Sequence, residues 1–149
     1  MKTIFFLACC LLFQAGAYAK DFDVNKKVLL SFNRIFTHAQ GLKWFEGTKQ
    51  ITAVFTQADA SFRVQFDRNG NIISCLKYYQ PWLLPVAIST EIRKQFPRQI
   101  PFGVTEVTVG NEMAYVIKMF DNDYWYTVRV SPQGELEVME QLLRADKNL

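Results

Sequence analysis

The chain has too few cysteines and histidines for most of the chemistry that is built on them. Of its three cysteines, Cys9 and Cys10 lie in the N-terminal apolar stretch, so only Cys75 remains for the folded part. A lone thiol cannot form an internal disulfide, and we expect a small buried apolar residue, with a reactive or intermolecular thiol as the alternative. The single histidine, His38, lies at the polar end of a predicted helix, where a solvated or capping role is expected. The sequence therefore predicts no catalytic residues.

The chain also lacks a strong excess of charge and the short motifs of the common cofactors. Lysine and arginine number 17 against 14 aspartates and glutamates, and they form no basic stripe. A protein that follows a phosphate backbone needs such a stripe, so nucleic acid is not an expected partner. The segments 67–70 and 121–123 gather oxygen ligands, but neither has the spacing of a calcium loop. We expect no metal, no cofactor and no enzymatic activity.

A long apolar run occurs at the N-terminus, and no second run of spanning length follows it. Lys2 precedes apolar residues 4–13 and the small-x-small site Ala17-Tyr18-Ala19, the order typical of a secretory signal peptide cleaved after Ala19. A membrane anchor needs about twenty apolar residues, so the run is too short to be one. A lipoprotein anchored at Cys9 is the alternative, which the very short apolar segment before that cysteine disfavours. We expect residues 20–149 to form one periplasmic or secreted domain.

What the sequence does contain is two copies of a β-hairpin pattern. Phe62, Val64 and Phe66 alternate with polar residues before the turn Asp67-Arg68-Asn69-Gly70. Residues 124–130 alternate in the same way before a second turn at 131–134. Alternation with a period of two places one side of a strand on a core. Glycine in both turns, with aspartate at the head of the first and proline in the second, reverses the chain.

The two hairpins belong to two similar halves, about 24–80 and 84–143. Each half is predicted to begin with a helix, because apolar residues recur at spacings of three and four over 24–36 and again after Leu84-Pro85. Four antiparallel strands are predicted after each helix. We expect an α+β fold in which two tandem helix-plus-four-strand antiparallel units form one curved sheet with the helices packed on one face. Generic hairpin similarity without duplication is the alternative.

The order of motifs along the chain points to a family. A helix leads into Trp44, a hairpin F-x-V-x-F-D-x-x-G begins at Phe62, and Leu84-Pro85 opens a helix that ends in Phe96-Pro97, followed by Y-x-V and a closing G-x-L strand. This order resembles the PepSY-like family of bacterial envelope proteins, which is similar in fold to the β-lactamase inhibitory protein. The resemblance implies a small exported binding or inhibitory module without enzymatic activity. The disulfides associated with that inhibitor cannot form with one mature cysteine.

Aromatic residues make up 15% of the chain, and not all of them can point inward. If Tyr126 and Val128 face the helices, their neighbours on the strand face the opposite way. The predicted partner-binding residues on that open face are Trp125, Thr127, Arg129, Arg63, Gln65 and Lys118. An exposed tryptophan beside arginine is typical of protein interfaces. We therefore expect a monomer that binds a protein or peptide of the cell envelope on its sheet face, unless a loop or Tyr78, Tyr79 and Trp82 cover the tryptophan.

Two other functions stay open. A small-ligand carrier would need a sizeable apolar cavity between sheet and helices. An inhibitor of an envelope enzyme would need an exposed loop, such as 121–123, that can enter the cleft of its target.

Overall fold

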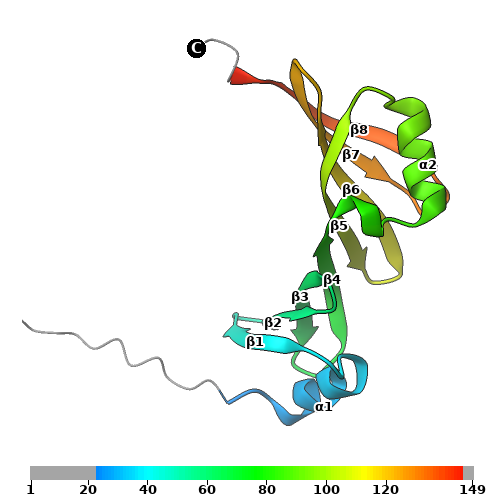
Figure 1. Ribbon diagram of the computed structural model, residues 1–149. Helices are drawn as coiled ribbons and strands as arrows, with labels where there is room; N and C mark the ends of the chain where they lie inside the picture. The colour runs from blue at the N-terminus through cyan, green and yellow to red at the C-terminus, as the bar shows by residue number, and fades with distance from the viewer. Residues whose placement is uncertain (1–22, 146–149) are drawn as a thin grey trace, which may run out of the picture.

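The computed structural model describes residues 23–145, and most of them lie in strands (Figure 1). The first elements are α1 (Lys26–Ile35), β1 (Gln40–Glu46), β2 (Gln50–Gln57), β3 (Ala60–Asp67) and β4 (Ile72–Tyr79). The 3-10 helix η1 (Pro81–Leu83) and α2 (Val86–Gln95) lead to β5 (Ile100–Val109), β6 (Glu112–Phe120), β7 (Tyr124–Val130) and β8 (Leu136–Leu143). The predicted signal peptide, its cleavage site after Ala19 and the alternative anchor at Cys9 lie outside the described residues.

All eight strands belong to one antiparallel sheet, in the order β1-β2-β3-β4-β5-β6-β7-β8. The predicted fold class, α+β with two tandem helix-plus-four-strand units, is wrong: this is a mostly-β fold, with two α-helices in the described part. The sheet is continuous across the boundary predicted between the two halves, because β4 and β5 pair from Ser74 opposite Val109 to Tyr79 opposite Val104. Backbone donors and acceptors that would otherwise lie at two strand edges satisfy one another there.

The helix α1 packs its apolar side on the first strands. Its N-terminus is capped by Asn25, whose side chain accepts a hydrogen bond from the Lys27 amide. Val28 and Phe32 on this helix are buried. They belong to a core cluster with Val24, Ile51, Ala53, Phe55, Val64 and Phe66. The Phe32 ring contacts four other aromatic rings, those of Phe36, Trp44, Phe55 and Phe66.

The helix α2 covers a second core cluster at the other end of the sheet. Ile88 and Ile92 point from this helix onto β5, β6 and β7. The strand residues that they meet include Val104, Ile117, Met119, Val128 and Val130. Figure 1 shows α1 beside β1–β3 and α2 beside β6–β8, so a central part of the sheet lies between the helices. Phe62 packs against both clusters and joins them.

The two turns predicted from glycine and aspartate are confirmed. Asp67 accepts hydrogen bonds from the amides of Asn69 and Asn71 and from the Asn71 side chain, which hold the pKa of its carboxyl below its usual value. Gly70 and Gly134 both have positive φ, 88° and 91°. The first turn is also fastened to α1, because the Asn25 side chain donates to the Arg68 carbonyl at 3.0 Å.

The remaining sequence predictions concern single residues and membrane contact. Cys75 is half-buried, and burial raises the pKa of its thiol. His38 is exposed in the turn after α1. Neither of the α-helices in 23–145 has the length and apolar character needed to cross a bilayer.

Candidate functional site on the outer face of the sheet

Both helices lie on the same face of the sheet, and the opposite face is called the outer face below. Residues directly opposite one another on neighbouring strands point to the same face. One such row runs across the outer face from β2 to β7: Thr56, Ser61, Tyr78, Thr105, Val116 and Arg129. A parallel row holds Lys43, Val54, Arg63, Leu76, Val107 and Ala114. The outer face is therefore a wide polar surface with apolar residues set into it.

The structure places all six predicted binding residues on the outer face, in two groups. Trp125, Thr127 and Arg129 follow one another on β7, and Lys118 of β6 lies opposite Thr127. Arg63 and Gln65 lie on β3, with β4 and β5 between them and the first group. Gln65 accepts a hydrogen bond from the Ser74 hydroxyl at 2.8 Å. The six residues share a face but do not form one patch.

Trp125 is part of a packed aromatic cluster rather than a free anchor. Its ring centroid lies 5.5 Å from those of Phe102 and Phe120, and 38% of the residue is exposed. The Arg144 guanidinium lies 4.7 Å from the Trp125 ring centroid, within cation–π range, and donates to the Asp121 carbonyl at 2.9 Å. The contacts come from these residues and not from the Tyr78, Tyr79 and Trp82 named as possible cover. The sequence did not identify Phe102 and Arg144 as contacts of Trp125, because neither lies in an alternating pattern that marks the outer face.

The cations of the outer face differ in how they are paired. Arg129 lies 3.9 Å from Glu137 of β8, and both side chains are exposed, so this ion pair contributes little to stability. Thr127 donates to the Glu140 carboxylate at 3.4 Å. Lys118 and Arg63 are exposed and make no ion pair within residues 23–145.

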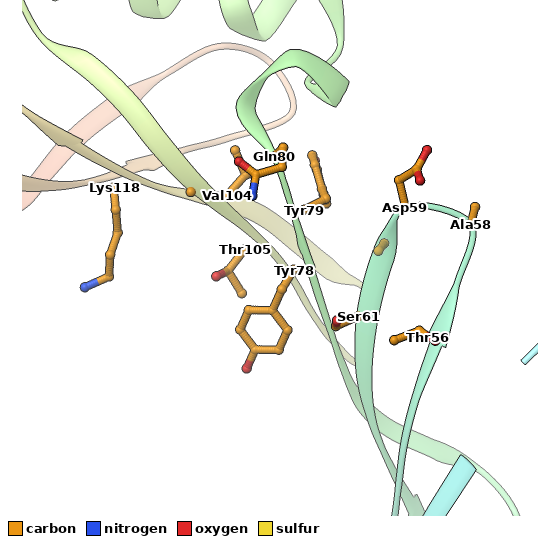
Figure 2. A pocket seen from close by; sticks show the side chains of 12 residues that line it. Thr56, Ala58, Asp59, Ser61, Tyr78, Tyr79, Gln80, Val104, Thr105 and Lys118 are labelled. Carbon is orange, nitrogen blue, oxygen red and sulfur yellow. The ribbon is translucent and has the colours of Figure 1, made fainter. Parts of the chain in front are cut away.

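A hollow of about 550 Å³ lies on the outer face where β4 ends. Figure 2 shows the side chains of Lys118, Thr105 and Tyr78 leaving three neighbouring strands toward the same side. The full lining is Thr56, Ala58, Asp59, Ala60, Ser61, Tyr78, Tyr79, Gln80, Gly103, Val104, Thr105 and Lys118. The hollow is thus lined by hydroxyl groups, one amide, one carboxylate and one ammonium group, together with the apolar residues Ala58, Ala60 and Val104.

The loop between β6 and β7 is held together by Asp121. Its carboxylate accepts hydrogen bonds from the Tyr126 hydroxyl at 2.7 Å and from the Gln99 side chain at 2.9 Å. The amides of Asp123 and Tyr124 also donate to it. These bonds, the one from Tyr126 above all, hold the pKa of the carboxyl well below its usual value. Because four donors from the loop and its neighbours converge on it, the carboxylate anchors the turn.

Replacing Asp121 with asparagine should weaken the acid dependence of stability. The folded-state pKa lies below the unfolded value of 3.8, so the ionised carboxylate stabilises the fold above that pH and the contribution is lost as pH falls. We expect a lower Tm than wild type at pH 7 and a smaller drop in Tm between about pH 4 and pH 2. Asp59→Asn, at an exposed position of the β2–β3 turn, is the control. Parallel Tm profiles for Asp121→Asn and wild type would contradict the anchor role.

The helix side of the sheet holds a smaller hollow between the two core clusters. It measures about 330 Å³, and Gln57, Phe62, Lys77, Tyr79 and Leu83 are among its lining residues. The Tyr79 hydroxyl donates to Glu106 at 3.3 Å, and Lys77 lies 4.0 Å from the same carboxylate. Burial, followed by the Glu106 charge, raises the pKa of Tyr79. The lining is mostly apolar, as expected of a small-ligand carrier, but the side chains of Gln57, Asp59 and Lys77 also contribute to it.

Comparison with solved structures shows what the fold is similar to. A BLIP-like protein from Bacteroides fragilis superimposes with a TM-score of 0.68 at 16% sequence identity, covering 86% of this chain and 93% of that one. A Bacteroides eggerthii protein described provisionally as periplasmic superimposes with a TM-score of 0.62 at 17% identity, covering 84% of this chain and 92% of that one. A DUF2874 family protein from Bacteroides ovatus gives 0.63 at 18% identity, covering 82% and 89%. At these identities the likeness establishes a BLIP-like fold and not a function.

No protein-family model matches the chain, and no curated protein matches its sequence significantly. The BLIP-like fold implied by the sequence resemblance is supported by the structural neighbours, whereas membership of the PepSY-like family is not shown.

Proposed function

We propose that this chain is an exported, non-enzymatic binding module that holds a protein or peptide on the outer face of its sheet. The observation that carries the proposal is that both helices pack on one face, which leaves the outer face without a covering layer in the described part of the chain. An antiparallel sheet can leave one face in water, and such a face offers a partner a wide, preformed surface.

The composition of the outer face supports a protein partner. Val54, Leu76, Val107 and Val116 are half-buried among polar neighbours, so a partner could remove further apolar surface from water. Tyr78 is 41% exposed at the centre of the face. Tyrosine and arginine are enriched in interfaces, because each covers a large area while keeping a polar group for hydrogen bonding.

The structural neighbours support the same class of function and the same compartment. One is named as a BLIP-like protein and another provisionally as a periplasmic protein. An inhibitor of an envelope enzyme is the narrower version of this proposal. Its candidate loop, 121–123, is anchored by the hydrogen bonds to Asp121, and a firmly held loop loses little entropy on entering a cleft.

Capture of an envelope protein by matched variants tests the proposal. Thr105 lies at the centre of the outer face, so Thr105→Arg should place a bulky charged side chain in the interface and weaken capture about tenfold or more. Thr90→Arg makes the same chemical change at an exposed position of α2, on the other side of the sheet, and should leave capture unchanged. Trp125→Ala is a poorer test, because it also removes packing with Phe102 and Phe120. Equal capture by both arginine variants would refute the proposal.

A small-ligand carrier is a second candidate, favoured by one observation. The Gln57 side-chain oxygen lines the helix-side hollow, is buried and has no hydrogen-bond partner within 23–145. A ligand donor could satisfy that oxygen. Native mass spectrometry of protein purified from the envelope separates the two functions. A bound small molecule that survives Thr105→Arg would favour the carrier, and ligand-free protein would favour the outer-face module.

A further inference from the structure

We infer that the outer face recognises an acidic, extended segment of its partner. This segment would lie in the part of the outer-face hollow beside residues 100–103 of β5, called the notch below, and present a carboxylate to Lys118. This inference rests on the proposed function and adds the chemistry of the partner.

The notch arises because β4 is shorter than the strand beside it. The last paired position of β4 is Tyr79, opposite Val104 of β5, after which the chain leaves the sheet for η1. β5 begins four positions earlier, at Ile100, and those residues run along β6 on their other side. Residues 100–103 therefore have a strand neighbour on one side only. The hollow of about 550 Å³ lies at this step, with the β2–β3 turn on its far side (Figure 2).

The backbone of β5 can be approached closely at the notch. Gly103 lines the hollow, and no heavy atom lies within 4 Å of the position that a Cβ would occupy there. The edge of β5 at the notch is next to η1, but the outer side of its backbone is open at Gly103, so the main chain of an extended segment can lie close against it. An extended segment is thus the form of ligand that fits the notch.

The charged side chains around the notch favour an acidic segment. Lys118 lies directly opposite Gly103, is exposed and has no ion-pair partner in residues 23–145. Arg63 and Lys43, on β3 and β1, add two further cations to the outer face. The acidic groups nearest in register are Asp59, on the turn at the far side of the hollow, and Glu140, which already accepts a hydrogen bond from Thr127. A partner carboxylate would supply the missing counter-charge for Lys118.

Hydroxyl groups continue the path from Lys118 across the sheet. Thr105, Tyr78 and Ser61 lie side by side in one row, and none of their hydroxyls makes a hydrogen bond to another side chain within the described chain. Hydroxyls can both donate and accept, so they suit the backbone and polar side chains of a bound segment. The accessible β5 backbone at Gly103, the exposed cations and the hydroxyls together favour an acidic segment over an apolar one.

Binding of defined peptides tests the inference by fluorescence anisotropy. The probes are a short labelled peptide of alternating glutamate and threonine and a matched peptide with lysine in place of glutamate. We expect wild type to bind the glutamate peptide at least tenfold more tightly than the lysine peptide. Raising the salt from about 50 to about 300 mM should weaken that binding severalfold, because the charges are exposed.

Three variants locate the site. Lys118→Ala should weaken binding of the glutamate peptide about fivefold or more, and Arg63→Ala should add to the loss. Gly103→Val keeps every charge but fills the notch, and should weaken binding at least tenfold. Lys94→Ala removes an exposed lysine of α2 on the other side of the sheet and is the matched control. Thermal denaturation of each variant verifies that it is folded.

The outcomes separate this inference from the proposed function. No binding of the glutamate peptide, equal binding of the lysine peptide, or equal effects of Lys118→Ala and Lys94→Ala would each overturn the acidic-segment inference. If Thr105→Arg abolishes capture of an envelope protein while salt and Lys118→Ala do not affect that capture, the binding function stands and the inference about its chemistry fails.

Discussion

Replacing Phe32 with alanine should lower the free energy of unfolding by about 3–5 kcal/mol, the usual cost of removing a buried phenylalanine. Phe32 is 2% exposed and its ring contacts four other rings, one each from the C-terminal cap of α1, β1, β2 and β3. Its removal leaves a cavity whose walls come from several elements and cannot close together easily. Denaturant unfolding followed by circular dichroism measures the effect.

The matched control for Phe32 lies on the same helix. Leu30 is 62% exposed, so Leu30→Ala removes an apolar side chain from α1 without opening a cavity, and should change the free energy of unfolding by less than about 1 kcal/mol. A loss at Phe32 no larger than the loss at Leu30 would mean that α1 does not pack on the sheet as described.

Replacing Gly70 with alanine should cost about 2–5 kcal/mol, from two sources. Gly70 has a φ of 88°, and a left-handed backbone costs a residue with a Cβ about 1–2 kcal/mol. The added Cβ would also lie 2.7 Å from the Lys27 carbonyl oxygen in α1, so the turn and the helix must move apart, an overpacking cost of about 1–3 kcal/mol. Thermal and denaturant unfolding of the variant give the total.

Gly110→Ala separates the two sources. Gly110 also has a positive φ, 58°, but nothing lies within 4 Å of its Cβ position. This variant should show the backbone cost alone, about 1–2 kcal/mol. Equal losses at Gly70 and Gly110 would show that the approach of the β3–β4 turn to α1 is looser than the structure describes.

Local structure could be predicted well from the sequence, because the signals are local. Aspartate, glycine and alternation marked the β3–β4 and β7–β8 turns within a residue or two. The spacing of Val28, Phe32 and Phe36 indicated α1, although Ile35, assigned to the same apolar side, is 45% exposed. A short helix has a narrow buried stripe, and an apolar residue at its margin can lie either in it or outside it.

The fold class was wrong in dividing the chain into two helix-plus-four-strand units, because local patterns identify the elements but not how they combine into one eight-stranded sheet. Alternation in 72–79 and 104–109 shows that each is a strand but not that they pair across η1 and α2.

For the site, the sequence predicted which face of the sheet its residues lie on, but not how they are grouped on that face. Which residues point outward follows from alternation, but Arg144 and Phe102 meet Trp125 through the pairing of separate strands, and the notch at Gly103 exists because two strands differ in length. These features are set by tertiary structure.

The gap between the two helices has a mechanical consequence. Along the middle of β4 and β5, the helix side carries Cys75, Lys77, Glu106 and Thr108, all half-buried and without a helix packed over them. Elsewhere a helix stiffens the strands beneath it, so torsion of the sheet meets least resistance at this seam. Phe62 packs against both core clusters, so we expect twisting of one end of the sheet relative to the other to be limited by that ring and by the β4–β5 pairing, and the curvature of the outer face to adjust only slightly to a partner.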